Sequence, residues 1–117
     1  MGAGDGDGRD GVVVVEPVVP SPREDFIAFE QAPELVGMEA PVYPELARAA
    51  GIEGTVLVRV LVAADGFVEE ATLLQGVLGL DEAALAAAVT AVFRPARQQG
   101  RPIAVWIVIP IEFRLRP

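Results

Sequence analysis

The segment "GTVLVRVLVAADGFV", residues 54–68, decides the fold because it predicts a β-hairpin. In its first half, β-branched residues alternate with others, which places them on one face of a sheet. These residues are Val56, Val58, Val60 and Val62. The pair Asp65-Gly66 then favours a tight turn, since glycine tolerates a positive φ. The return strand, residues 67–75, does not hold a single period, so we expect a bulge near Glu69-Glu70.

A short helix is expected before this hairpin and a longer helix after it. Pro44 suits the first turn of the short helix, where its missing N–H is not needed, and Gly51 suits its end. The stretch "LDEAALAAAVTAVF", residues 80–93, predicts the longer helix, with Asp81 as N-cap and an end at Pro95. The expected buried faces are Leu46, Ala47 and Ala50 on the first helix, and Leu85, Ala88, Val89 and Val92 on the second.

The stretch "IAVWIVIPIEFRL", residues 103–115, predicts a long strand whose odd-numbered positions form an unbroken apolar face. Pro110 cannot donate a hydrogen bond to a neighbouring strand, so we expect this strand at a sheet edge. Trp106 and Val108 fall on the face away from the core. A hairpin, a helix and a third strand together predict an α+β fold. It has a three-stranded, mainly antiparallel sheet of order 2-1-3 with two helices on one face.

The composition removes most catalytic chemistry. The 117 residues contain no Cys and no His, and all nine cationic residues are Arg, so there is no Lys. Thiol and Lys nucleophiles, imidazole bases and thiolate or imidazole metal sites are therefore absent. The adjacent carboxylates Glu69-Glu70 and Asp81-Glu82 do not predict an acid–base pair, because neighbours in a strand face opposite sides and Asp81 is interpreted as a cap. We predict a protein that is not an enzyme and that needs no cofactor and no metal.

The charge is unevenly distributed along the chain. The net charge is −8; residues 1–40 carry nine acids and two Arg, and residues 94–117 carry five Arg and one acid. A broad basic face is missing, so nucleic acid is excluded as a partner. No apolar run approaches the roughly 20 residues that span a bilayer, and "VVVV" at 12–15 is far shorter. The composition divides the chain into a flexible leader or spacer remnant, an extended segment with a loop that packs on the domain, and the domain itself. These parts are residues 1–22, 23–40 and 41–117.

Several short motifs, each weak alone, occur in one order and spacing. They are Tyr43-Pro44, Gly51-Ile52-Glu53-Gly54, Asp65-Gly66, Leu80-Asp81, Phe93-Arg94-Pro95-Ala96, Gly100-Arg101-Pro102 and Pro110-Ile111-Glu112-Phe113. Together with the upstream "PELVG", they make residues 33–116 resemble the C-terminal domain of TonB energy-transducer proteins.

This resemblance implies a periplasmic domain of a protein that is anchored in the inner membrane by a segment absent from this sequence. Such domains bind the Ton box, a short segment of outer-membrane TonB-dependent transporters, by adding it as a strand to the edge of their sheet. Force from an inner-membrane proton-channel complex passes through that contact and drives the active uptake of iron chelates, vitamins or other solutes.

Combined with the predicted edge strand, the resemblance places the partner-binding surface along the last strand. Strand addition uses unpaired backbone groups for affinity and side-chain positions for specificity. The candidate partner-binding residues are Arg94, Arg97, Ala104, Val105, Trp106, Ile107, Val108 and Ile109. The two arginines would steer an acidic peptide towards the edge, and Trp106 would anchor it. A five-residue strand is expected to bind weakly, with a Kd on the order of micromolar.

Two alternatives remain open at this point. The domain could be a structural or dimerisation module of another envelope-spanning, TolA-like protein, and an edge strand also invites a homodimer. In addition, the acidic segment "EDFIAFE", residues 24–30, alternates like a strand and could itself occupy the edge until a partner displaces it.

Overall fold

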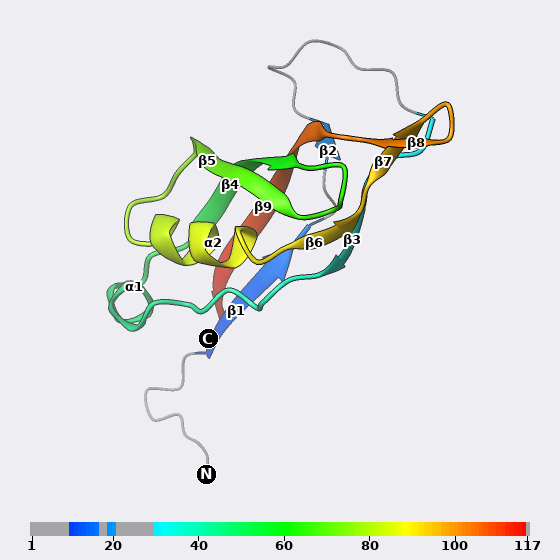
Figure 1. The fold of residues 1–117 in the computed structure, drawn as a ribbon. Helices are drawn as coiled ribbons and strands as arrows, with labels where there is room; N and C mark the ends of the chain where they lie inside the picture. Colours follow the sequence, from blue (N-terminus) through cyan, green and yellow to red (C-terminus); the bar gives the residue numbers. More distant parts are fainter. Residues whose placement is uncertain (1–9, 17–18, 21–29, 117) are drawn as a thin grey trace.

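The computed structural model describes residues 10–16, 19–20 and 30–116. Its central sheet has the order β1-β9-β4-β5 with every neighbouring pair antiparallel, and β2 also pairs with β9 (Figure 1). The strands are β1 (Asp10–Val15), β2 (Val19–Pro20), β4 (Gly54–Val62), β5 (Val68–Gln75) and β9 (Val105–Arg116). The order β5-β4-β9 confirms the predicted order 2-1-3. The sheet is wider than predicted, because β1 and β2 lie on the far side of β9.

The hairpin β4-β5 follows the prediction in detail. The four alternating valines of β4 are fully buried. Gly66 adopts a φ of 93°, and the N–H of Ala63 donates to the carbonyl oxygen of Phe67 at 2.8 Å. Leu61 pairs with Glu70 whereas Val62 pairs with Val68, so Glu69 is an extra residue and the predicted bulge is confirmed.

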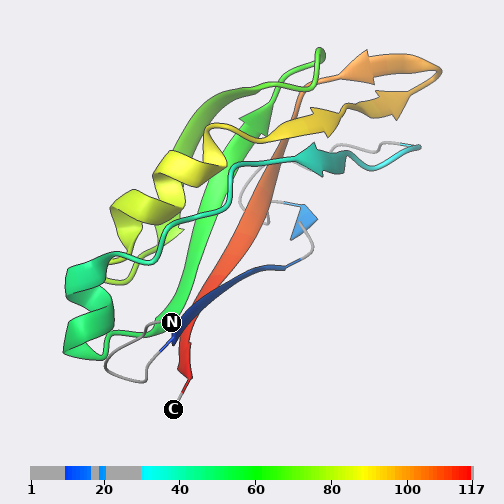
Figure 2. The same ribbon diagram turned by 90° about the horizontal axis from the view of Figure 1, so that it is seen from below.

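Two helices, α1 (Glu45–Ala50) and α2 (Asp81–Ala88), cover one face of the sheet (Figure 2). The predicted buried face of α1 is right for Ala47, the one buried residue of that helix, but wrong for Leu46, which is 86% exposed, and for Ala50, which is also exposed. A helix of six residues has room for little more than one turn of contact, and here the alanine faces the sheet.

The predicted face of α2 is right for Ala88, which is buried, and for Leu85, which packs partly buried against the core, but wrong for Val89. Its buried residues are Ala84, Ala87 and Ala88, whereas Val89 is 56% exposed. Small side chains let the helix lie close to the sheet, and the fully buried Leu80 just before it supplies the bulk. The helix ends at Ala88, well before the predicted end at Pro95.

Asp81 does not cap α2 as predicted. It is the first residue of the helix, and its Oδ1 accepts a hydrogen bond from the backbone N–H of Val77 at 2.6 Å. The carboxylate therefore fastens the preceding loop to the helix instead of satisfying the first helical amides.

The core lies between the helices and the sheet. It contains the β4 valines, the alanines of α2 and the odd-numbered residues of β9, of which Ile107, Ile109, Ile111 and Phe113 are almost completely buried. This confirms the predicted apolar face of the last strand. Val108 lies outside the main core, on the opposite face as predicted, but it is only 2% exposed, so this face is covered at that position.

Two small sheets extend beyond the central sheet (Figure 1). They are formed by β3 (Glu34–Gly37) with β6 (Val92–Arg94), and by β7 (Ala96–Gln98) with β8 (Arg101–Ile103). Most of the segment 24–30 lies outside the described residues. Its last residue, Glu30, donates its N–H to the carbonyl oxygen of Arg97 in β7. Neither helix of the described part is long and apolar enough to cross a membrane.

The prediction that the last strand is an edge strand is wrong for this structure. β9 pairs with β4 on one side and with β1 and β2 on the other (Figure 2). The carbonyl oxygen of Pro110 accepts a hydrogen bond from the N–H of Glu16 at 2.9 Å, so the missing N–H of Pro110 also faces β1 and β2. Pro110 thus marks the side of β9 that lacks one donor, and β1 and β2 pair with β9 on that side.

Candidate functional site

The candidate site is the outer side of β9, defined as the side that faces away from β4. In an antiparallel pair the N–H and C=O of one residue point to the same neighbour, and successive residues alternate between the two neighbours. Since Pro110 faces outwards, the amides of Val108, Glu112 and Arg114 also face outwards. Those of Ile111 and Phe113 point to β4. These outward backbone groups are what an added strand can use.

In the described residues, β1 and β2 occupy most of this side. β1 pairs with residues 111–116 of β9, and β2 pairs with Ile107 and Val108. Glu16, directly after β1, donates its N–H to the carbonyl oxygen of Pro110, which itself offers no donor on this side. The outer side of β9 therefore accepts an antiparallel strand.

β1 is held by side-chain contacts as well as by its backbone. Val13 and Val15 pack against the main core from the helix-covered face of the sheet. Gly11 lies against the ring of Tyr43, where an added Cβ would stand only 2.5 Å from Cδ2 and 2.8 Å from Cγ. Any side chain at position 11 would therefore push β1 away from Tyr43 or displace the ring.

Tyr43 connects this contact to the core. Its ring meets Phe113 edge to face, with centroids 5.3 Å apart and planes at 89°, and its hydroxyl donates to the carbonyl oxygen of Ile52. Burial raises the pKa of the Tyr43 hydroxyl above its usual value, and the nearby Glu53 carboxylate raises it further. Glu53 also accepts the N–H of Leu115 at 2.8 Å, at the end of β9.

This environment predicts a loss of stability at alkaline pH. Because the folded-state pKa of Tyr43 is raised, the folded chain holds the phenol proton more tightly than the unfolded chain. That contribution to stability is complete below about pH 10 and is lost as the pH rises through the folded-state pKa. We expect the free energy of unfolding, measured by denaturant titration, to fall above about pH 10.

The control for this prediction is Tyr43→Phe, which should be less stable at neutral pH through the lost hydrogen bond but should lose the alkaline fall. Tyr43 is the one tyrosine and the chain has no Lys or Cys, so tyrosinate absorbance follows this group alone. An equal alkaline fall in Tyr43→Phe would contradict the assignment.

Trp106 lies next to the region that β2 covers. It is partly exposed, and the guanidinium carbon of Arg59 lies 4.2 Å from the centroid of its ring, within cation–π range. Arg59 belongs to β4, so the contact bridges the two central strands on the face opposite the helices. Trp106 is the one tryptophan of the chain, and its fluorescence is a natural reporter of this end of β9.

The other predicted residues of β9 contribute unequally. The side chains of Val105, Ile107 and Ile109 are buried in the core, so they can offer a partner only their backbone. Ala104 is exposed and lies between β8 and β9. The structure thus places residues 105–109 together in β9, where Trp106 is the one side chain of these five that is not buried.

Arg94 and Arg97 lie elsewhere, in β6 and β7. The Arg94 guanidinium is 3.4 Å from the Glu34 carboxylate, with both side chains more than two-thirds exposed, and Arg97 donates to the carbonyl oxygen of Gly100 at 3.1 Å. An exposed ion pair of this kind contributes at most about 1 kcal/mol. The two arginines line one groove of about 220 Å³ with Gln31 and Glu34. They belong to the small sheets and not to the outer side of β9.

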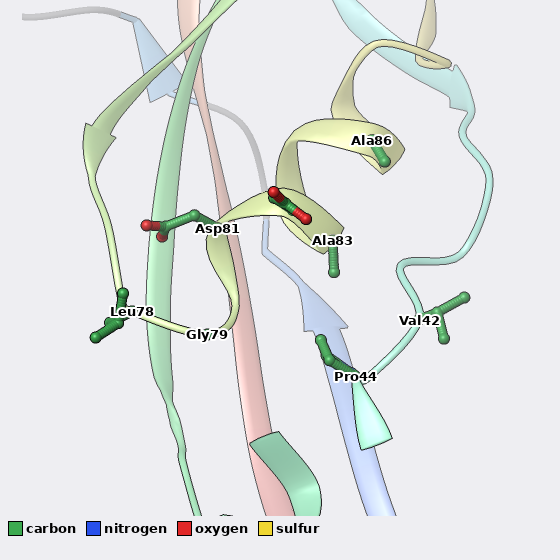
Figure 3. A pocket seen from close by; sticks show the side chains of 8 residues that line it. Val42, Pro44, Leu78, Gly79, Asp81, Ala83 and Ala86 are labelled. Carbon is green, nitrogen blue, oxygen red and sulfur yellow. The ribbon is translucent and has the colours of Figure 1, made fainter. Parts of the chain in front are cut away.

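An apolar groove of about 720 Å³ lies between α2 and the segment that leads into α1 (Figure 3). Val42, Pro44, Leu78 and Ala83 line it, and Leu78 is 90% exposed. Its ionisable groups are Asp81 and Glu82, and Asp81 is engaged by the Val77 N–H. Among the described residues, no group of three His, Cys, Asp or Glu side chains is arranged to hold a metal ion.

Comparison with known proteins identifies the domain. Residues 39–115 match the family model described as Gram-negative bacterial TonB protein C-terminal. The chain belongs to this family. The matched range contains α1, β4, β5, α2 and most of β9, whereas β1 and β2 lie before it.

Individual TonB proteins show the same relationship. The chain is 41% identical over 78 residues to Protein tonB2 of Pseudomonas aeruginosa, covering 65% of this chain and 29% of that protein. It is also 41% identical over 86 residues to Protein TonB of Vibrio cholerae, covering 71% of this chain and 35% of that protein. The match thus spans about a third of the length of these relatives.

A solved structure agrees on the fold. The solution NMR structure of the Pseudomonas aeruginosa TonB C-terminal domain superimposes with a TM-score of 0.51 at 27% identity, over 72% of this chain and 82% of that one. The α+β architecture expected from the sequence is therefore that of a TonB C-terminal domain.

The sequence did not predict the residues that hold β1 against the domain. Gly11, Val13 and Val15 were read as part of a leader, and the run "VVVV" was considered only as a membrane span. A signal was present: four β-branched residues in succession favour a strand, and a glycine precedes them. A run of identical residues has no period, however, and so does not indicate which face is buried.

Proposed function

We propose that this domain is the partner-binding end of a TonB-type energy transducer. In this proposal it works in the periplasm as part of a protein anchored in the inner membrane, and it is not an enzyme. It binds the Ton box of outer-membrane transporters as an added strand on the outer side of β9. Through this contact it passes on force from an inner-membrane proton-channel complex for active solute uptake.

The observation that carries the proposal is the match to the TonB family over residues 39–115, together with the geometry of β9. β9 is the last strand of the matched domain, and its only neighbour within that domain is β4. Its outer side already takes an antiparallel strand over residues 107–108 and 111–116, supplied by the leader. A peptide strand from another protein would use the same backbone groups.

The packing of β9 suits a strand that carries load. β9 is paired with β4 without a break over nine residues, from Phe113 opposite Gly54 to Val105 opposite Val62. Its inward side chains are buried in the main core. Tension on a strand paired to the outer side of β9 would therefore be shared along the ladder and passed to the whole domain.

The test is a titration of the full chain with a synthetic Ton box peptide from a TonB-dependent transporter. Saturable NMR shifts should concentrate on the outward amides of Trp106, Val108, Glu112 and Arg114, and Trp106 fluorescence should change with the same affinity. Val108→Pro removes one outward donor, as Pro110 already does two residues away. It should weaken binding about tenfold or more, because a lost hydrogen bond and a ring facing the partner act together.

Two controls separate this effect from its alternatives. Val108→Ala removes the buried side chain but keeps the N–H, so its loss of affinity should be smaller. Leu73→Pro places the same change on β5, at the opposite edge of the sheet, and should leave affinity unchanged. Shifts concentrated on β5, or equal affinity of Val108→Pro and the unchanged chain, would overturn the assignment to β9.

A further inference from the structure

The leader and the proposed partner need the same backbone groups. β1 and β2 together pair with eight residues of β9, on both sides of Pro110. The amides of Val108, Glu112 and Arg114 point at these strands, and a partner strand on the outer side of β9 would require the same amides. Both cannot be bound at once.

The leader is fitted to this place by contacts that a generic linker would lack. Gly11 lies against the Tyr43 ring where no side chain fits, and Val13 and Val15 reach the core beside Phe113 and Ile111. On the opposite face, Val12 pairs with Arg114. These side-chain contacts of β1 are therefore all consistent with the same pairing register between β1 and β9.

The charge distribution also favours pairing of the leader with β9. Residues 1–22 carry four acids and one Arg, whereas residues 94–117 carry five Arg and one acid. Opposite net charges draw the leader towards the end of the chain that contains β9, and added salt weakens this attraction.

The leader is also held loosely enough to leave. Val12, Val13, Val14 and Val15 are only partly buried, whereas Ile111 and Phe113 of β9, opposite Val15 and Val13, are fully buried. Among the described residues, β2 contributes two residue pairs. Detaching the leader would leave intact the ladder between β9 and β4 and the contacts of the helices.

We infer that β1 and β2 act as a resident strand that competes with the partner for the outer side of β9, so that partner binding requires its release. This inference rests on the proposed function, because it regulates the site proposed there. A competitor in the same chain lowers the apparent affinity by the fraction of molecules in which it is released. If about one molecule in ten is open, release of the strand should strengthen peptide binding about tenfold.

The first test is hydrogen exchange of the free full-length chain. Gly11→Ala adds one methyl group that would stand against the Tyr43 ring, so that either β1 or the ring has to move. We expect the amides of Glu112 and Arg114 to exchange faster in this variant, while Ile111 and Phe113, which donate to β4, keep their protection. Gly37→Ala is the matched control, because an added Cβ there meets nothing within 4 Å.

A second pair of variants tests the register independently of Tyr43. Val13→Asp places a carboxylate against the core and should release the strand. Val12→Asp makes the same change one residue earlier, on the opposite face and across from Arg114, and should not release it. Unchanged protection of Glu112 and Arg114 in both Gly11→Ala and Val13→Asp would overturn the inference.

The binding measurement then separates this inference from the proposed function. With the same Ton box peptide, Gly11→Ala and Val13→Asp should bind about tenfold more tightly than the unchanged chain, and Gly37→Ala and Val12→Asp should not. Equal affinity of all five proteins at β9 would overturn the resident strand and leave the proposed function intact. Absence of binding even where exchange shows Glu112 and Arg114 to be open would overturn the proposed function itself.

Discussion

Phe113→Ala is expected to lower the free energy of unfolding by about 3–5 kcal/mol, which is the usual cost of truncating a fully buried Phe. Phe113 has no exposed surface, and it is the largest fully buried side chain of the core. It lies on β9 opposite Gly54 of β4 and Val13 of β1, and its ring meets Tyr43 edge to face. The truncation would remove both the core volume and the support behind Tyr43.

This cost is large compared with the total stability of a small domain, which is about 5–15 kcal/mol. The measurement is equilibrium denaturation followed by far-ultraviolet circular dichroism. Phe67→Ala is the matched control, since it removes the same atoms from a side chain that is 57% exposed, and it should change stability by no more than about 0.5 kcal/mol. Similar losses in the two variants would mean that β9 is not packed as described.

The variant also has a consequence at the candidate site. Tyr43 lies between Phe113 and Gly11, so a cavity at position 113 allows the Tyr43 ring to move away from β1. We therefore expect Phe113→Ala to loosen the leader in addition to the core. Exchange of the Glu112 and Arg114 amides should increase more than the global loss of stability explains.

The central sheet could be predicted because its signals are local. The alternation of β4, the Asp65-Gly66 turn and the odd-numbered face of β9 each follow from residues close together in the chain. One physical rule, that a polypeptide strand alternates its side chains, converts these patterns into buried faces. The order of the strands then follows from how short connections cross a sheet.

The helix faces could not be read in the same way. α2 is rich in alanine, and alanines can face either the sheet or the solvent at little cost, so the sequence predicts a buried stripe that includes the larger Leu85 and Val89. The structure buries Ala84, Ala87 and Ala88, leaves Leu85 partly buried against the core and leaves Val89 56% exposed.

The occupied side of β9 was the least predictable feature. Asp10 pairs with Arg116, so the contact joins the two ends of the chain, and no local pattern specifies such a pair. Pro110, which has no backbone N–H, already indicated in the sequence that one side of the last strand lacks a hydrogen-bond donor. The segment that the sequence offered as a possible occupant, residues 24–30, lies mostly outside the described residues. Tyr43 and the edge of the core, against which residues 11, 13 and 15 pack, come together only in the folded domain.

Gly66→Ala is expected to lower the free energy of unfolding by about 2–4 kcal/mol, from backbone strain and a steric clash together. The Asp65-Gly66 pair is a turn signal, and the φ of 93° at Gly66 is one that L-residues rarely adopt. The structure adds a second constraint. A Cβ at position 66 would stand 2.1 Å from the carbonyl oxygen of Phe93, and the N–H of Phe93 donates to the carbonyl oxygen of Gly66 at 2.8 Å.

Gly100→Ala separates these two contributions. Gly100 has a similar φ of 76°, but an added Cβ there meets nothing within 4 Å, so its substitution should cost only the strain of about 1 kcal/mol. Chemical denaturation gives the loss in the free energy of unfolding for each variant, and the difference between the two losses is the cost of the clash with Phe93. A large difference would show that Gly66 is needed to join the hairpin to β6 as well as to turn the chain. Equal losses would mean that the turn alone requires the glycine, and that the contact with Phe93 yields when a methyl group is added.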